Sequence, residues 1–186
     1  GLTPFLAAIQ SNENDLIHLL LLSDNCMSTI DISKPVNNNN DYIPMLMAKN
    51  SNIENFKLLL DQALSHSSDI NFDFINVKNN KGESLITIAA GLDSADLFNY
   101  ICETQNPDLN ILIDDKIPLV FKAAQSYDFE VFKSIIEHGN FDLNQMFEGK
   151  TVLHYAVESY QDAGDKVKFI IQDENVDVNC ATKRGS

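Results

Sequence analysis

The sequence predicts an all-α repeat protein, a solenoid of stacked helix–turn–helix units that forms a single domain over residues 1–186. Three observations predict this fold class. One apolar motif recurs five times along the chain, each copy is followed by a second apolar run, and none of these second runs exceeds six residues. A unit of this size cannot bury its own apolar face, so the units must stack to be stable.

The repeated motif is plainest in its fifth copy, residues 149–157, which read GKTVLHYAV. Residues 1–9 (GLTPFLAAI) and 82–90 (GESLITIAA) follow the same pattern, and weaker copies begin at Asp41 and near Asp115. Equivalent positions lie 40, 41, 33 and 34 residues apart, at Pro4, Pro44, Leu85, Pro118 and Val152. We therefore expect five repeats with approximate bounds 1–37, 38–78, 79–113, 114–145 and 146–186.

Each motif predicts the start of a short first helix. The hydroxyl groups of Thr3 and Thr151 stand where a side chain can cap the free N–H groups of a helix start. Proline lacks an N–H group and follows at the predicted first helical position in three copies, as Pro4, Pro44 and Pro118. We therefore expect the first helices to begin near Thr3, Ile43, Ser84, Ile117 and Thr151.

The second helix of each unit is predicted from a short, strongly apolar run. These runs occupy residues 16–21, 56–60, 97–102, 131–136 and 167–171. A membrane-spanning helix needs about twenty apolar residues, so runs of this length exclude membrane insertion. Two long connections, between Leu22 and Asp41 and between Leu60 and Ile75, explain the two longer spacings. The asparagine run at 37–40 is interpreted as compositional bias.

A period near 33 residues with this motif resembles the ankyrin repeat, and the resemblance covers nearly the whole chain. It implies that an Asp-apolar-Asn element, such as residues 108–110, leads from each helix pair into a β-hairpin, which we call a finger, and that its Asn helps to hold the turn. It also implies that His154 ties the finger backbone to the helix pair. The chain departs from the family pattern where the glycine between two helices is replaced, at Asn12, Ser51, Asp93, Tyr127 and Tyr160.

The chain is strongly acidic, with a formal net charge of −14 and a pI near 4.4. Nucleic acids and anionic membranes bind to clustered Lys and Arg, so neither is expected as a partner. The three cysteines, Cys26, Cys102 and Cys180, are odd in number and lack C-x-x-C spacing. This pattern favours free thiols over disulfides or a zinc site, and predicts an intracellular, cytoplasmic location.

No sequence pattern typical of catalysis or metal binding is present. The four histidines lack H-E-x-x-H spacing, and neither G-x-S-x-G nor G-x-x-x-x-G-K-[ST] occurs. His138-Gly139 is interpreted as a helix end, with Gly139 as a left-handed cap and His138 near the negative end of the helix dipole. We therefore expect no enzyme activity, no metal and no cofactor in this chain.

In ankyrin arrays the fingers and the ends of the first helices line a concave groove, so the resemblance implies a module that binds a protein or peptide. Phe147 stands out because an aromatic side chain at a finger tip has no core to fill and aromatic residues are favoured at interfaces. The acidic charge predicts a basic partner surface. Motif positions give nine candidate partner-binding residues: Tyr42, Lys81, Glu83, Lys116, Tyr127, Phe147, Glu148, Lys150 and Tyr160.

Other functions remain open on the sequence alone. The segment can be a non-catalytic targeting or regulatory arm of a larger enzyme or of a secreted effector, or a structural spacer without a tight ligand. The last residues, 182–186, resemble the opening of another repeat. Because terminal repeats without a neighbour expose apolar stacking faces, we also expect fraying or end-to-end self-association at the two ends.

Overall fold

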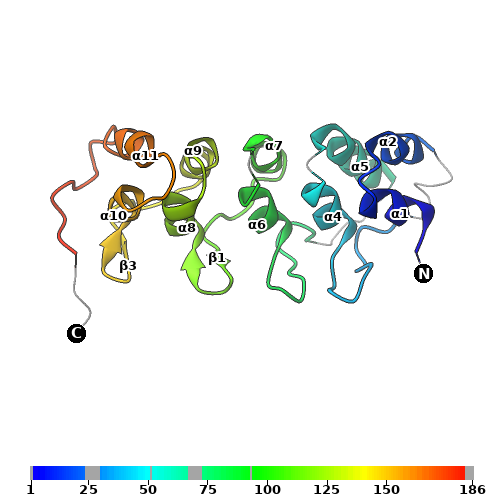
Figure 1. Cartoon of the computed structure of the whole chain (residues 1–186), viewed down its shortest axis with the longest axis horizontal. Helices are drawn as coiled ribbons and strands as arrows, with labels where there is room; N and C mark the ends of the chain where they lie inside the picture. Colours follow the sequence, from blue (N-terminus) through cyan, green and yellow to red (C-terminus); the bar gives the residue numbers. More distant parts are fainter. Residues whose placement is uncertain (1, 24–29, 51, 67–72, 93, 183–186) are drawn as a thin grey trace. The chain divides into compact units, whose positions relative to one another are not determined.

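The computed structural model describes the chain apart from residues 1, 24–29, 51, 67–72, 93 and 183–186 (Figure 1). It divides into two compact units, unit 1 (residues 1–89) and unit 2 (residues 90–186). The expected fold class is confirmed, because successive helix pairs with short antiparallel strand pairs make up the described chain. None of the helices in these described ranges combines the length and the apolar composition that crossing a bilayer requires.

Unit 1 is built from helix pairs whose members contact one another and the next pair. Helix α1 contacts α2 and α4, while α5 contacts both α2 and α4. Stacking of this kind covers the apolar face that a single pair leaves open. The helices are α1 (Pro4–Gln10), α2 (Asn14–Leu21), α4 (Ile43–Lys49), α5 (Ile53–His66) and α6 (Leu85–Ala90).

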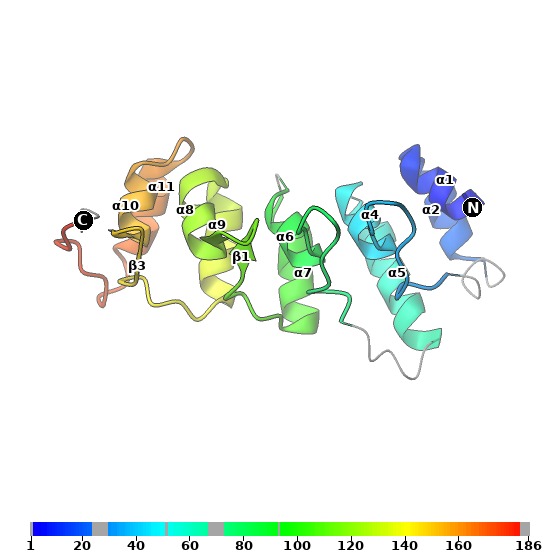
Figure 2. The same ribbon diagram turned by 90° about the horizontal axis from the view of Figure 1, so that it is seen from below.

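Unit 2 repeats this arrangement and adds two strand pairs. Helix α8 contacts α9 and α10, and α11 contacts both α9 and α10. Figure 2 shows these two pairs side by side, and Figure 1 shows the strands on the side of α8 and α10, away from α9 and α11. The elements are α7 (Asp96–Gln105), β1 (Leu112–Ile113), β2 (Ile117–Pro118), α8 (Leu119–Ser126), α9 (Phe129–His138), β3 (Met146–Phe147), β4 (Lys150–Thr151), α10 (Val152–Val157) and α11 (Ala163–Ile170).

The second helices bury the apolar side chains that predicted them. Phe56, Phe98 and Phe132 stand at similar points of α5, α7 and α9, and each is at most 1% exposed. Burying a side chain of this size stabilises the fold by about 1.5–3 kcal/mol. Helix α11 departs from the pattern, because Ile170 and a lysine, Lys166, are its buried residues.

The Asp-apolar-Asn elements form turns held by the aspartate. The backbone N–H of Asn110 donates to Asp108 Oδ1 at 2.9 Å, and Asn144 N–H donates to Asp142 Oδ1 at 3.0 Å. Such turns occur because a short carboxylate can accept from the N–H two residues on. The Asn144 side chain has a different role, since it bonds the backbone near residue 175 of the following repeat. The expectation that the Asn helps to hold the turn is confirmed for Asn110, whose side chain donates to Asp108 Oδ1 at 3.1 Å, and is wrong for Asn144.

The helix starts agree with the sequence to within two residues, with one correction. Thr3 Oγ1 accepts the N–H of Leu6 at 3.2 Å, and Pro4 opens α1 as expected. Pro118, expected at a first helical position, instead ends β2 and caps α8, which begins at Leu119. Its φ of −58° suits both a strand end and a cap, so a proline alone does not distinguish them.

Gly139 has a different role from the one expected. Its φ of −91° and ψ of 159° are extended, so the left-handed cap is wrong, although α9 does end at His138. A Cβ atom built on Gly139 would lie 1.9 Å from the ring of Phe141. The position therefore needs glycine because a ring packs directly on the backbone.

His154 and Thr151 cap the start of α10 reciprocally. Thr151 N–H donates to His154 Nδ1 at 3.3 Å, and Thr151 Oγ1 lies 2.8 Å from the same nitrogen. Thr151 is 1% exposed, so water could not easily replace His154 as the partner of its N–H group. The histidine thus links strand β4 to helix α10, as the resemblance implied.

Replacing His154 with alanine is expected to lower the free energy of unfolding by about 1–3 kcal/mol, because the buried N–H of Thr151 loses its acceptor. Urea unfolding measures this difference. His154→Gln should recover most of the loss, since glutamine is a usual partner in this type of cap. An unchanged unfolding midpoint for His154→Ala would show that the cap does not stabilise α10.

Candidate functional site

Two tight hairpins form finger tips in unit 2. The β3–β4 loop is Glu148-Gly149, with φ of 50° and 76°, and residues 114 and 115 have φ of 51° and 54°. Two successive positive φ values define the turn whose twist matches that of an antiparallel strand pair. Aspartate tolerates this conformation better than most residues. The turns fix the directions in which Asp114 and Glu148 project.

An aromatic cluster supports the β3–β4 hairpin. The ring of Phe147 lies 5.4 Å from the Phe121 ring and 6.3 Å from the Tyr155 ring, centroid to centroid. Phe121 and Tyr155 come from α8 and α10 and are buried, whereas Phe147 is half-buried. The expectation that Phe147 has no core to fill is therefore wrong. Its ring is held in place by the cluster and still meets solvent.

Lys150 lies beside this cluster and is itself held. Its ammonium group is 5.8 Å from the centroid of the Tyr155 ring and 2.6 Å from Glu158 Oε2. The hydrogen bond to Glu158 raises the pKa of Lys150. Burial, followed by the negative charge of Glu148, raises the pKa of the Tyr155 hydroxyl. The Lys150 ammonium group, the Tyr155 ring and the Glu158 carboxylate thus lie together beside the β3–β4 hairpin.

The other candidates in unit 2 differ in exposure. Lys116 and Glu148 are exposed, on different hairpins. Tyr127 is half-buried, and burial followed by the charge of Asp114 raises its pKa to about 12. Tyr160 is 86% exposed, and no hydrogen bond or ring contact in the described chain joins it to a hairpin. We call Lys116, Phe147, Glu148 and Lys150, with Phe121 and Tyr155 beneath them, the hairpin surface.

Asparagine side chains, rather than strands, hold the fingers of unit 1. Asn37 Oδ1 accepts the N–H groups of Asn39 and Asp41, each at 3.0 Å. Asn79 Oδ1 likewise accepts the backbone N–H groups of Lys81 at 2.9 Å and of Glu83 at 3.0 Å. One carboxamide oxygen thereby closes each turn.

The asparagine run is therefore a structural element, and its interpretation as compositional bias is corrected. Asn40 has a φ of 56°, the left-handed conformation that asparagine adopts readily. Its side chain donates to Asn80 Oδ1 at 2.8 Å, and Asn80 in turn donates to Asn38 O at 3.0 Å. These bonds join two successive fingers of unit 1.

A polar network fixes Glu83, one of the candidate residues. Asn79 Nδ2 donates to Asp41 Oδ1 at 2.6 Å and to Glu83 Oε2 at 2.9 Å. Lys49 Nζ lies 2.9 Å from Glu83 Oε2 and 3.8 Å from Asp41 Oδ1. Glu83 therefore already has partners inside unit 1. The neighbouring candidates are Lys81, which is exposed, and Tyr42, which is half-buried and pairs through its backbone with Pro35.

The network lowers the pKa of both carboxyl groups. Burial raises the pKa of Asp41, but hydrogen bonds from Asn37, Asn79 and Asn39 outweigh it, so the pKa falls below 3.8. Burial likewise raises the pKa of Glu83, but Lys49 and Asn79 bring it below 4.5. Because the folded pKa values lie below the unfolded ones, the unfolded chain takes up these protons first as the pH falls.

We expect unit 1 to lose stability in acid for this reason. The contribution of the two carboxylates is complete above pH 4.5 and is lost as the pH falls through their lowered pKa values. Urea unfolding reported by the buried methyl groups of Met45 and Met47 would measure it between neutral pH and pH 3. Asp41→Asn should flatten the dependence, and identical profiles for the two proteins would contradict the prediction.

One buried lysine of unit 2, Lys166, was not among the candidate residues chosen from the sequence. Lys166 is 0% exposed on α11. Its Nζ donates to Ala124 O at 3.3 Å, to Ser159 Oγ at 2.9 Å and to Tyr127 O. An ammonium group has three donors, and three acceptors meet them here. Lys166 thereby joins α11 to the end of α8 and to the segment between α10 and α11.

The position of Lys166 could have been inferred from its spacing. It stands four residues before Ile170, on the face of α11 that is buried. Burial lowers the pKa of Lys166, against the charges of Asp162 and Asp128, which raise it. A lysine on the apolar side of a short helix is thus a structural signal, because burying its charge requires partners.

No metal centre is found among the described residues, which contain no cluster of His, Cys, Asp and Glu suited to a metal ion. Cys102 and Cys180 are free thiols, and burial raises the pKa of Cys102 to about 12. The third cysteine, Cys26, lies outside the described residues.

Comparison with known proteins gives the following matches. Residues 105–182 match the family model of ankyrin repeats, in three copies. The crystal structure of EF0377, an ankyrin repeat protein, is similar at a TM-score of 0.69 and 20% identity, over 98% of this chain and 86% of that one. A chain from the complex of the predatory endopeptidase Bd0816 of Bdellovibrio bacteriovorus with the immunity protein Bd3460 gives the same TM-score of 0.69, identity of 20% and coverage of 98% and 86%. No curated protein sequence is significantly similar.

Proposed function

We propose that this chain, an ankyrin-repeat protein, is a protein–protein interaction module that binds its partner through the hairpin surface of unit 2. Ankyrin repeats are in general protein–protein interaction modules. The observation that carries the proposal is the half-buried ring of Phe147, held against Phe121 and Tyr155 and still open to solvent. Aromatic side chains of this kind supply much of the binding energy at interfaces.

Order before binding supports this role. Both hairpins close through turns with positive φ values, and the aromatic cluster packs against the β3–β4 hairpin. A partner then binds without first immobilising loose side chains, each of which would cost about 0.5–1.5 kcal/mol. The ion pair of Lys150 with Glu158 likewise holds its long side chain in one place.

The charges of the hairpin surface favour a partner with charges of both signs. Lys116 and Glu148 are exposed, and Lys150 is balanced by Glu158. The whole chain carries a net charge of −14, which attracts a basic partner over a longer range. We propose that this field sets the rate of encounter and that the hairpin contacts set the lifetime of the complex.

Affinity capture from cell extract with three immobilised proteins tests the proposal. The first is the unmodified chain, and the second carries Phe147→Ala with Lys116→Ala. The third, a matched control, carries Lys133→Ala with Lys168→Ala on α9 and α11, away from the hairpins (Figure 1). Proteins retained by the first and third but not by the second support the hairpin surface. Equal retention by all three contradicts it, and no retention by any would favour a structural spacer.

We also propose that the chain acts without catalysis and inside the cell. The ankyrin fold is typically non-catalytic. The free thiols of Cys102 and Cys180 suit a reducing compartment. Assay of the full-length protein would separate this role from that of a targeting arm, because an arm would carry an enzyme elsewhere in the same polypeptide.

End-to-end self-association is a second candidate, supported by exposed leucines on α2 and beside it. Leu16, Leu19 and Leu22 are 51%, 62% and 57% exposed, and their spacing of three residues places them on one side of the helix. We expect sedimentation velocity to show association that rises with protein concentration and that Leu19→Glu weakens. A monomer at every concentration would contradict this expectation.

A further inference from the structure

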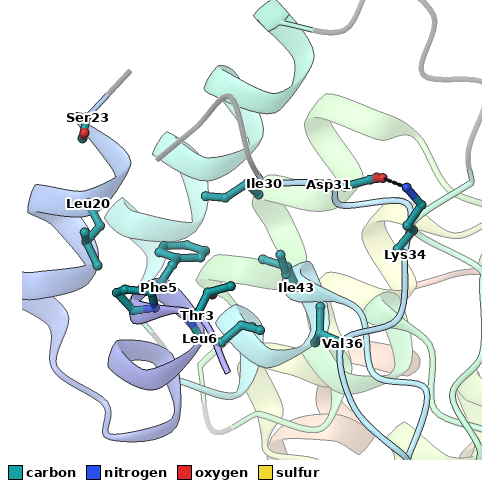
Figure 3. Close-up of a pocket in the computed structure, with 11 residues that line it drawn as sticks. Thr3, Phe5, Leu6, Leu20, Ser23, Ile30, Asp31, Lys34, Val36 and Ile43 are labelled. Atoms are coloured by element: carbon teal, nitrogen blue, oxygen red, sulfur yellow. Dashed lines mark hydrogen bonds and ion pairs between the residues drawn. The ribbon is translucent and has the colours of Figure 1, made fainter. Parts of the chain in front are cut away.

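Unit 1 contains a cavity of 420 Å³ between the first turn of α1, the end of α2 and the segment that leads to α4 (Figure 3). The lining residues named here belong to the described chain. Phe5, Leu6 and Ile43 are 3%, 8% and 4% exposed and form its deepest part. Leu20, Ile30 and Val36 are half-buried and complete the apolar wall.

The two charged residues that line the cavity, Asp31 and Lys34, form an ion pair at its edge. Lys34 Nζ lies 2.7 Å from Asp31 Oδ2, and these side chains are 77% and 44% exposed. Figure 3 shows the pair at one side, pointing toward each other rather than toward Phe5. Hydrogen bonds from Lys34 and then Ser33 lower the pKa of Asp31 to about 2, so the pair stays ionised near neutral pH. An ionised ligand would therefore lose its hydration without gaining a free counter-charge.

Two uncharged polar side chains also line the cavity, the exposed Thr3 and the half-buried Ser23, and the hydroxyl of Thr3 is held in one orientation. Its oxygen accepts the N–H of Leu6 at 3.2 Å, which fixes its position at the start of α1. No acceptor for its proton is found among the residues that the structure describes. The cavity thus offers an apolar wall with two hydroxyl groups, those of Thr3 and Ser23, of which only the Thr3 oxygen is positioned by a hydrogen bond.

We propose that this cavity binds a neutral bicyclic aromatic molecule whose single hydrogen-bond acceptor meets the Thr3 hydroxyl. Ligand cavities in proteins typically enclose about 300–1,000 Å³ and are mostly apolar with a few polar groups. An apolar cavity of about 150 Å³ is enough for benzene, so 420 Å³ has room for a larger ring system. This site is separate from protein binding, because it shares no residue with the hairpin surface.

Quinoline is a suitable probe, since it is bicyclic and neutral near pH 7 and has one acceptor nitrogen. Titration of the full chain, followed by NMR of the methyl groups, should give saturable shifts at Leu6, Leu20, Ile30, Val36 and Ile43. Naphthalene has the same shape and lacks the nitrogen. We expect Thr3→Val to weaken quinoline binding severalfold and to leave naphthalene binding unchanged, whereas Thr3→Ser should retain both.

Filling the cavity provides the second arm of the test. Val36→Phe and Ile30→Phe each place a ring in the space that quinoline would occupy, and either should weaken binding by about tenfold or more. The matched control is Leu112→Phe in β1, 43% exposed and in the other unit, which should not change binding. Shifts that do not saturate, or unchanged affinity in a folded Val36→Phe or Ile30→Phe protein, would overturn the proposal.

Discussion

Replacing Lys166 with methionine is expected to lower the free energy of unfolding of unit 2 by about 3 kcal/mol. The substitution leaves the carbonyl oxygens of Ala124 and Tyr127 without the Lys166 donor, whereas the hydroxyl of Ser159 still accepts from the N–H of Gln161. Each buried acceptor without a partner costs about 1–3 kcal/mol. Part of this loss is offset, because methionine does not carry the charge whose burial lowers the pKa of Lys166.

Lys168→Met is the matched control for Lys166→Met. Lys168 stands two residues further along α11, its side chain is 75% exposed and it pairs with Asp165 at 3.1 Å. An exposed pair contributes about 0–1 kcal/mol, so this variant should unfold almost like the unmodified chain. Urea unfolding with amide hydrogen exchange of α8 and α11 measures both. Equal stability of the two variants would show that the buried lysine does not hold these helices together.

Replacing Phe147 with alanine is expected to raise the dissociation constant of the partner about thirtyfold, corresponding to about 2 kcal/mol at an interface hot spot. The effect should fall mainly on the dissociation rate, because the ring makes short-range contacts only after the complex has formed. The variant also loses the packing against Phe121 and Tyr155. Surface plasmon resonance must therefore be accompanied by circular dichroism, so that loss of folding is recognised.

Added salt separates the contribution of long-range electrostatic attraction to partner binding from the contribution of short-range contacts. Exposed charges are screened over about 8–10 Å at moderate ionic strength, so added salt should slow association more than it speeds dissociation. Leu112→Ala in β1, a side chain 43% exposed, is the control for loss of apolar surface. An acidic partner, or binding that survives replacement of Phe147 and Lys116 together, would contradict this account of the interface.

The repeat fold could be predicted from the sequence because its signals are local and recur. Thr3 caps α1 and Thr151 caps α10, and apolar runs that recur at intervals of 34 to 41 residues give the second helices. Glycine and proline were less informative. Gly139 accommodates the ring of Phe141 rather than a left-handed turn, and Pro118 ends a strand. Both residues satisfy more than one local geometry, and contacts with neighbours decide which one forms.

The candidate residues were predictable in position but not in their partners. Phe147 was expected at a finger tip and lies in β3 beside the Glu148-Gly149 turn, and its packing depends on Phe121, 26 residues earlier. Glu83 was expected to face a partner, whereas Lys49 of the preceding repeat already pairs with it within unit 1. Pairings of this kind form between successive repeats, and no pattern within one repeat reveals them.

The most direct measurement of the central claim is amide hydrogen exchange of the full chain with and without a captured partner. Binding at the hairpin surface predicts new protection in residues 112–118 and 146–151. Helices α9 and α11, on the other side of unit 2, should exchange as in the free chain (Figure 1). Protection confined to α9 and α11, with unchanged exchange in both hairpins, would contradict the account.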